Sequence, residues 1–243
     1  MSRLWYIVIA LVTFLALLVF LAPASLVKAA IERLPGTTLG DVRGTLWSGS
    51  GNLAVEGRPL GLLTYRFKPL DLLLARASYD ATLASDTVDL KASASATFSG
   101  ALADLSGRVD SAALRELLQR YDLAIGGSFE TQHLSFVHRW KSRLPNVKGE
   151  LRWSGAPVSY RLGNVTHRVS LPPLTGFVDS AAGQPEMTAY EADHDTPLLL
   201  ARVAVDGWVT IGITKRFTQL LGQPWAGSDA DHAVVLEVQE QLF

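Results

Sequence analysis

The sequence predicts a mainly β protein with one N-terminal transmembrane helix and a long, twisted antiparallel sheet that carries one to three short helices. Three observations predict this fold class. An uncharged apolar stretch opens the chain, and most of the remaining sequence alternates apolar and polar residues with the period of two that is typical of strands. Helical spacing is confined to short pieces, without the repeated strand-helix rhythm of a doubly wound sheet.

The apolar stretch runs from Leu4 to Leu21 and continues without charge to Val27. As a helix with a rise of about 1.5 Å per residue, residues 4–21 would be about 27 Å long. The hydrocarbon core of a bilayer is about 30 Å thick, and the continuation to Val27 supplies the remaining length. We therefore expect residues 4–27 to be a membrane anchor behind a short cytoplasmic N-terminus at residues 1–3. The anchor residues are Leu4, Trp5, Ile7, Leu11, Phe14, Leu18 and Leu21.

A cleaved signal peptide is the competing interpretation, because Ala22-Pro23-Ala24 supplies an A-x-A sequence. The hydrophobic region of a signal peptide is only about 7 to 15 residues long. The longer stretch and the proline inside the site favour a retained anchor. Arg3 precedes the stretch while Lys28 and Arg33 follow it, and we expect the N-terminus in the cytoplasm.

The clearest strand prediction spans Val88 to Ser99, where the two residue classes alternate without error. Shorter alternating runs cover Val165–Leu171, Val203–Ile213 and Leu151–Trp153. Strands with one buried face and one solvent-exposed face are typical of antiparallel sheets. The apolar face of the first run comprises Val88, Leu90, Ala92, Ala94, Ala96 and Phe98.

Three short segments have helical spacing. The first follows a cap at Asp110 or Ser111, the second is TKRFTQLLG ending at Gly222, and the third begins at Pro69. We expect such helices to plug an end or an open edge of the sheet.

The segments GTLWSGSGNLAV from Gly44 and GELRWSGAPVSY from Gly149 resemble each other. Their Trp and Gly residues, Trp47, Gly49, Trp153 and Gly155, are candidates for an interaction surface. Trp225 is a fifth candidate. The favoured interpretation is structural, with each Trp closing a strand before a glycine turn. If the similarity of these two segments reflects an old duplication, the domain at residues 28–243 has two similar halves near 40–140 and 145–243.

No sequence motif indicates catalysis or a cofactor. The 22 Lys and Arg residues balance 23 Asp and Glu without a basic cluster, which argues against nucleic acid. The absence of cysteine excludes disulfides and thiol chemistry, and neither H-E-x-x-H, a phosphate loop nor a nucleophile elbow occurs. Glu191, Asp193, His194 and Asp195 could bind a cation or transfer protons, but a solvated turn is favoured. We expect no enzyme, no metal site and no cofactor.

The N-terminal stretch, GTLWSG from Gly44, GELRWSG from Gly149 and TKRFTQLLGQPW followed by DHAVVLEVQEQLF together resemble the type II secretion system protein N family, also called general secretion pathway protein N. This resemblance covers nearly the whole chain. It implies a single-pass protein of the bacterial inner membrane with a periplasmic domain, an accessory part of the machine that carries folded proteins across the outer membrane. The implied partners are the lipid bilayer and other inner-membrane or periplasmic secretion components.

The family is similar in outline to periplasmic proteins whose long curved sheet forms an open trough or half-barrel. A rival to the assembly role is therefore a groove that binds lipid or another hydrophobic ligand. Small residues such as Ala92, Ala94 and Ala96 would leave room for an acyl chain, whereas a packed helix over them would make an ordinary core.

Overall fold

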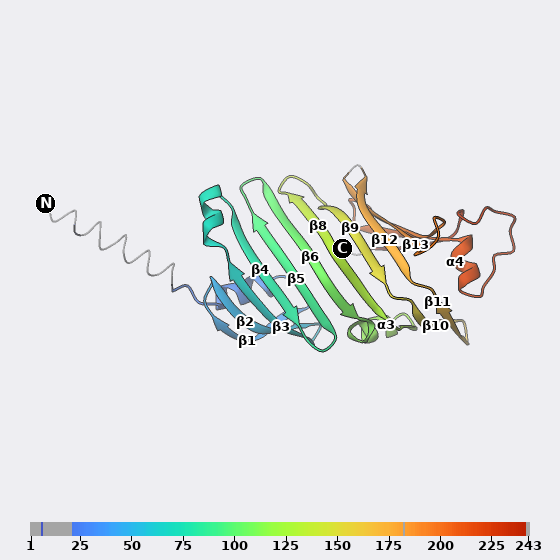
Figure 1. Cartoon of the computed structure of the whole chain (residues 1–243), viewed down its shortest axis with the longest axis horizontal. Helices are drawn as coiled ribbons and strands as arrows, with labels where there is room; N and C mark the ends of the chain where they lie inside the picture. The colour runs from blue at the N-terminus through green and yellow to red at the C-terminus, as the bar shows by residue number, and fades with distance from the viewer. Residues whose placement is uncertain (1–5, 7–20, 182, 242–243) are drawn as a thin grey trace. The chain divides into compact units, whose positions relative to one another are not determined.

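Antiparallel strands make up most of the chain, as the alternation predicts (Figure 1). The computed structural model describes Tyr6 and residues 21–181 and 183–241. The chain divides into two compact units, Met1–Ser85 and Asp86–Phe243. The predicted repeat of halves near 40–140 and 145–243 stays a prediction.

The anchor residues Leu4, Trp5, Ile7, Leu11, Phe14 and Leu18 lie outside the described residues. Within the part of the chain that the structure describes, no helix has the length and apolar character needed to cross a membrane. Leu21 is described and exposed. The transmembrane helix stays a prediction.

The first unit is a four-stranded antiparallel sheet in the order β1-β2-β3-β4. The residues just after Leu21 belong to this unit: Ala22 and Ala24 are 8% and 4% exposed, and Pro23 pairs with Thr45. Leu46 donates its backbone N–H to the carbonyl of Ala22. The elements are α2 (Ser25–Ile31), β1 (Thr37–Gly44), β2 (Ser48–Val55), β3 (Arg58–Phe67), the 3-10 helix η1 (Pro69–Leu74) and β4 (Ala77–Ala84).

The helix predicted from Pro69 forms as η1, with the proline in its first turn. Its leucines do not pack inward. Leu70, Leu72, Leu73 and Leu74 are between 51% and 85% exposed. We call these four side chains the η1 leucine patch.

The second unit contains a nine-stranded antiparallel sheet in the order β5-β6-β8-β9-β12-β13-β14-β15-β16. Its strands follow one another across the sheet in chain order, so each strand pairs with the strands that precede and follow it in this sheet. The strands are β5 (Val88–Ala96), β6 (Gly100–Asp110), β8 (Ser128–Arg139), β9 (Asn146–Trp153), β12 (Leu174–Ala181), β13 (Gln184–Glu191), β14 (Pro197–Val203), β15 (Trp208–Thr214) and β16 (Val234–Gln241).

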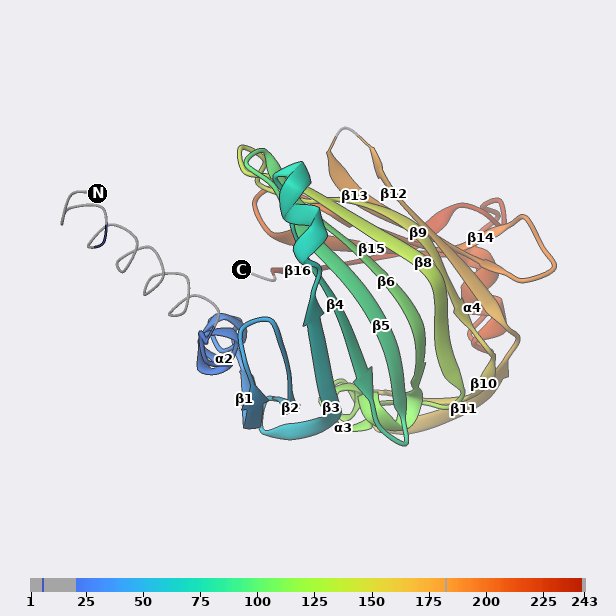
Figure 2. The same cartoon turned by 60° about the vertical axis from the view of Figure 1, so that its left-hand side comes forward.

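Two insertions leave this large sheet and meet each other. The first joins β6 to β8 through η2 (Ser111–Leu114), α3 (Arg115–Gln119) and β7 (Leu123–Ile125). The second joins β9 to β12 through β10 (Ala156–Leu162) and β11 (Val165–Leu171). They form a separate three-stranded sheet, β11-β10-β7, which lies with α3 at one end of the long strands (Figures 1 and 2).

The two faces of the nine-stranded sheet differ in polarity. Antiparallel partners share a face, so the register defines rows that cross every strand. One row is apolar throughout: Ala92, Leu105, Leu134, Gly149, Val178, Met187, Ala201, Ile211 and Val238. The neighbouring row is polar: Ser93, Asp104, Ser135 and Lys148 on one side, and Asp179, Glu186, Arg202, Thr210 and Gln239 on the other.

Two details of the strand predictions were wrong. Phe98 is not on the apolar face of β5, because the chain turns after Ala96 to pair with β6, and its side chain is 93% exposed. The run from Val203 to Ile213 is two strands, because Gly207 makes a turn between β14 and β15 and leaves Val205 outside both.

The two remaining helix predictions were confirmed. Asp110 caps η2 by accepting the backbone N–H of Ala112, and α3 follows directly. The helix α4 (Lys215–Leu220) begins behind the cap Thr214, and Gly222 adopts the positive φ that ends it.

Candidate functional site

The candidates Trp47 and Gly49 lie at the hairpin between β1 and β2. The Trp47 ring packs on Phe67 at a centroid distance of 4.9 Å, and Phe67 lies 5.0 Å from Tyr79. Tyr65 donates its hydroxyl to the carbonyl of Thr45 at 2.7 Å. A Cβ added at Gly49 would collide with the Arg43 carbonyl and the Tyr65 hydroxyl. The space beside this hairpin is thus filled by aromatic rings of β3 and β4.

Burial affects the ionisation of the two tyrosines in this cluster. It raises the pKa of Tyr65 above the ordinary value of 10.0, and the neighbouring Tyr79 raises that pKa further. Burial also raises the pKa of Tyr79. The cluster therefore holds both hydroxyls in their neutral form.

The candidates Trp153 and Gly155 end β9 in the second unit. Trp153 is 7% exposed, stacks near Phe129 at 6.4 Å and donates its indole N–H to the carbonyl of Gly126 at 2.9 Å. Gly155 has φ +72°, and a Cβ there would lie 2.6 Å from the nitrogen of Pro173. The glycine thus permits the sharp departure of the chain toward β10.

Trp225 contacts a different part of the chain from Trp47 and Trp153. It lies in the loop after α4, is 40% exposed, and donates its indole N–H to the carboxylate of Asp229 at 3.1 Å. Of the five interaction candidates, only Trp153 lines a substantial apolar cavity.

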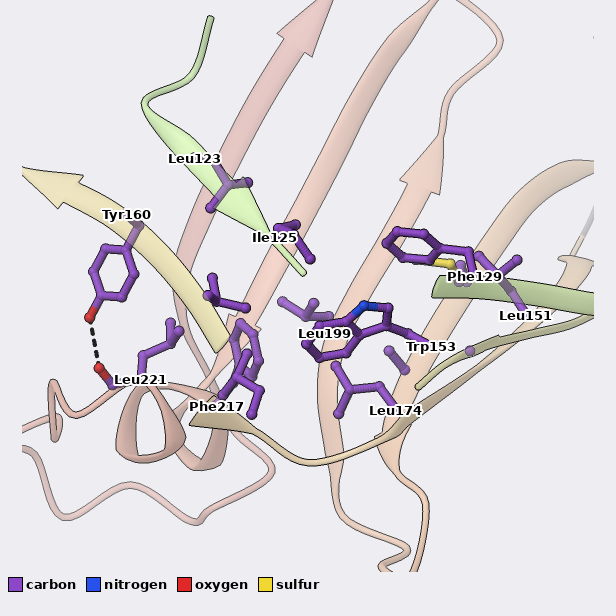
Figure 3. Close-up of a pocket in the computed structure, with 15 residues that line it drawn as sticks. Leu123, Ile125, Phe129, Leu151, Trp153, Tyr160, Leu174, Leu199, Phe217 and Leu221 are labelled. Carbon is purple, nitrogen blue, oxygen red and sulfur yellow. Dashed lines mark hydrogen bonds between the residues drawn. The ribbon is translucent and has the colours of Figure 1, made fainter. Parts of the chain in front are cut away.

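This cavity, which we call the Gly176 pocket, has a volume of about 390 Å³ and lies in the second unit (Figure 3). Its floor is a cross-strand row of the large sheet in which two small residues, Gly176 and Ala189, stand between Leu151 and Leu199. Trp153, Phe129, Leu174 and Met187 extend this floor. The small residues leave the hollow that larger side chains would fill.

The small sheet and the α4 segment form the other wall. The strands β7, β10 and β11 contribute Leu123, Ile125, Val158, Tyr160 and Leu171, and the α4 segment contributes Phe217 and Leu221. Figure 3 shows Leu123, Ile125 and Phe217 directed toward the space beside Trp153. The pocket therefore exists because both insertions return over the apolar face of the large sheet.

The polar side-chain atoms in the pocket lining are already satisfied by backbone groups. Only Trp153 and Tyr160 bring such atoms. The Trp153 N–H binds the Gly126 carbonyl, and the Tyr160 hydroxyl donates to the Leu221 carbonyl at 2.7 Å (Figure 3). The walls thus present hydrocarbon and the thioether of Met187.

A hollow of this kind is destabilising when nothing fills it. Cavity formation costs roughly 24 cal/mol per Å³, so a sealed void of this volume would cost about 9 kcal/mol, which is an upper bound for this partly open pocket. That figure matches the whole stability of a typical domain. Water offers little relief, since a buried water needs two to four polar partners and the lining presents none free.

The same strands line a polar hollow of about 900 Å³. On β9, Glu150 and Arg152 line it while Leu151, between them, lines the Gly176 pocket. The predicted acidic cluster lies here in part. Glu191 lies 3.4 Å from the Arg216 guanidinium and 3.7 Å from the His194 ring. Among the described residues, no group of His, Cys, Asp and Glu has the geometry of a metal site.

Trp153 was a candidate from the sequence, whereas the rest of the pocket was missed. The lining residues are ordinary apolar residues, and nothing in their spacing separates a wall from a core. The one available signal was the pair of small residues, Gly176 and Ala189, in strands otherwise rich in larger side chains.

Searches of the curated proteins and of the solved structures each return no significant match. The family model described as "Type II secretion system (T2SS), protein N" matches residues 35–226. This match covers the greater part of both units and includes Trp47, Gly49, Trp153, Gly155 and Trp225. The chain therefore belongs to the protein N family of the type II secretion system.

Proposed function

We propose that this protein is a non-catalytic part of the type II secretion machinery that is anchored in the inner membrane and acts in assembly or scaffolding. In this proposal the segment 4–27 holds the chain in the bilayer and both units lie in the periplasm. Its partners are other inner-membrane or periplasmic secretion components. Membership of the protein N family supports the secretion role.

The observation that carries the tethering role is the junction behind the apolar stretch. Ala22 and Ala24 are buried in the first unit, and the backbone of this segment bonds to Gly44 and Leu46. The fold thus begins directly behind Leu21, without a linker. A short tether confines a domain beside the bilayer and raises its effective concentration toward partners there. The same junction supports a retained anchor, since Ala22-Pro23-Ala24 is part of the folded unit.

The η1 leucine patch supplies a surface for such a partner. Four exposed leucines on one short helix are unusual for a monomeric soluble unit, and contiguous apolar surface marks contact sites. We assign this patch to a protein partner within the machine.

Topology is tested by fusing a reporter that is active only outside the cytoplasm to the C-terminus of the full chain. The proposal expects an active reporter in the membrane fraction. An inactive reporter would overturn the orientation, and an active reporter on a soluble, shortened chain would overturn the anchor.

The partner surface is tested by crosslinking in cells, which the lack of native cysteine makes clean. Leu73→Cys should crosslink to a secretion component, whereas Arg66→Cys, at an exposed position of β3 in the same unit, should not. Leu73→Asp should reduce secretion at unchanged protein level. Equal crosslinking from both cysteines, or full secretion with Leu73→Asp, would exclude the patch.

A further inference from the structure

We propose that the Gly176 pocket binds one hydrocarbon chain, such as the acyl chain of a fatty acid or a lipid. The binding site is the space between the floor row of Leu151, Gly176, Ala189 and Leu199 and the opposite wall of β7, β10, β11 and α4. This inference is independent of the assembly role, because it rests on the interior of the second unit alone.

The lining chemistry selects the class of guest. The two polar side-chain atoms of the lining are bonded to the carbonyls of Gly126 and Leu221. The floor strands use their backbone groups in the ladders between β9, β12, β13 and β14. A guest with polar atoms at this depth would leave them without partners, at a cost of several hydrogen bonds. A hydrocarbon brings no such atoms.

A peptide is a poor occupant for the same reason. Every peptide unit carries an N–H and a C=O that need partners when they are buried. The pocket offers none from its side chains. An acyl chain can enter along its whole length without this penalty.

The size of the pocket fits part of a long chain. Ligand pockets span roughly 300 to 1,000 Å³, and a cavity of roughly 150 Å³ already accepts benzene. A volume of about 390 Å³ is more than twice that cavity. It therefore accommodates a guest well beyond a single ring.

An apolar path leads from the pocket to the edge of the sheet. The floor row continues from Leu199 to Ile213 on β15 and Leu236 on β16. Leu236 and Val238 are about half exposed on this last strand. The part of a chain that extends beyond the pocket would lie on this path, with its polar end toward solvent.

The test uses the full chain in lipid nanodiscs and a bromine-labelled fatty acid, whose bromines quench a tryptophan in contact with them. Trp153 forms part of the wall, so a bound probe should quench it. The quenching due to Trp153 is obtained by subtracting the signal of Trp153→Phe from that of the wild type. This subtraction removes the contributions of the other tryptophans and of probe dissolved in the bilayer.

Two variants fill the pocket, and one is a matched control. A Cβ at Gly176 makes only ordinary contacts, 3.5 Å or more from Met187 and Leu151, so Gly176→Leu puts its side chain into the hollow. Ala189→Leu fills the same row. Thr175→Leu adds comparable bulk one residue away, on the side of the polar hollow. Each filling variant should weaken the Trp153-dependent quenching at least tenfold, and Thr175→Leu should leave it unchanged.

Competition on the wild-type chain decides the matter even if both filling variants misfold by circular dichroism. Unlabelled fatty acid should restore Trp153 emission, and a leucine-rich peptide should not. The inference is overturned if no quenching depends on Trp153, if unlabelled acid fails to compete, if the peptide competes equally, or if folded filling variants bind the probe as the wild type does.

Discussion

The two Trp-Ser-Gly segments have nearly the same local sequence but lie in different interiors. In the first unit, Trp47 packs against Phe67, and aromatic rings occupy the space around it. In the second unit, Trp153 stands beside Gly176 and Ala189, and a pocket remains. The same three-residue motif thus occurs in both settings, and residues distant in sequence decide whether its tryptophan closes a core or lines a cavity.

Removing the two indoles should give the largest contrast. We expect Trp153→Ala to destabilise its unit by about 4 kcal/mol, since it loses a buried ring and the partner of the Gly126 carbonyl. Trp47→Ala should cost about 2 kcal/mol, because Trp47 is only half buried. Urea unfolding followed by circular dichroism measures both. Equal costs would remove the distinction between the two Trp-Ser-Gly segments.

The glycines that follow the indoles should differ less. Gly155→Ala should cost about 3 kcal/mol, because it adds backbone strain at φ +72° to a collision with Pro173. Gly49→Ala should cost about 2 kcal/mol from its collisions with the Arg43 carbonyl and the Tyr65 hydroxyl, as no positive φ is involved. The same unfolding assay applies, and a neutral Gly155→Ala would contradict the assigned turn.

Adding one methyl group to each interior should change stability in opposite directions. Gly176→Ala should stabilise by about 0.5 kcal/mol, because its Cβ meets only ordinary contacts beside the pocket. Gly51→Ala should destabilise by about 1 kcal/mol, because its Cβ lies 3.0 Å from the buried Leu39 side chain. Thermal midpoints of the two variants measure the difference. Two changes of the same sign would mean that the interiors are packed alike.

The smallest effect concerns alkaline pH. The folded-state pKa of Tyr65 is raised above 10.0, so the unfolded chain loses this proton first and stability falls as pH rises through and beyond that value. Tyr65→Phe should cost about 1 kcal/mol near neutral pH through its lost bond to Thr45. It should also flatten the alkaline decline of the unfolding midpoint. An unchanged decline would assign it to other groups.

Most of the fold could be predicted from the alternation of apolar and polar residues, because a half-buried antiparallel strand places successive side chains on a buried and an exposed face. The runs that became β5, β9 and β11 were recognised from it. It failed at Phe98, where the sequence keeps its period through a turn that only the pairing of β5 with β6 reveals. The cap at Asp110 and the stop at Gly222 made two of the helices recognisable, because these signals also lie within a few residues of the helix they bound.

The pocket could not be predicted in this way. Ile125 becomes a neighbour of Trp153 only after the two insertions have left the large sheet and met, and Phe217 only after α4 has packed there. Hydrophobic spacing says that each residue is buried but not that a volume between them stays unfilled. That information lies in the register, which sets Gly176 beside Ala189.

The two insertions also set an order of events during folding. Neighbouring strands such as β13, β14 and β15 are joined by short turns, so they can pair as soon as both strands have been synthesised. The wall opposite the apolar floor of the Gly176 pocket needs β7 to pair with β10 and α4 to pack, so it requires residues up to Leu221. Until then the floor is uncovered, and an apolar molecule present at that moment can bind to it before the opposite wall has formed.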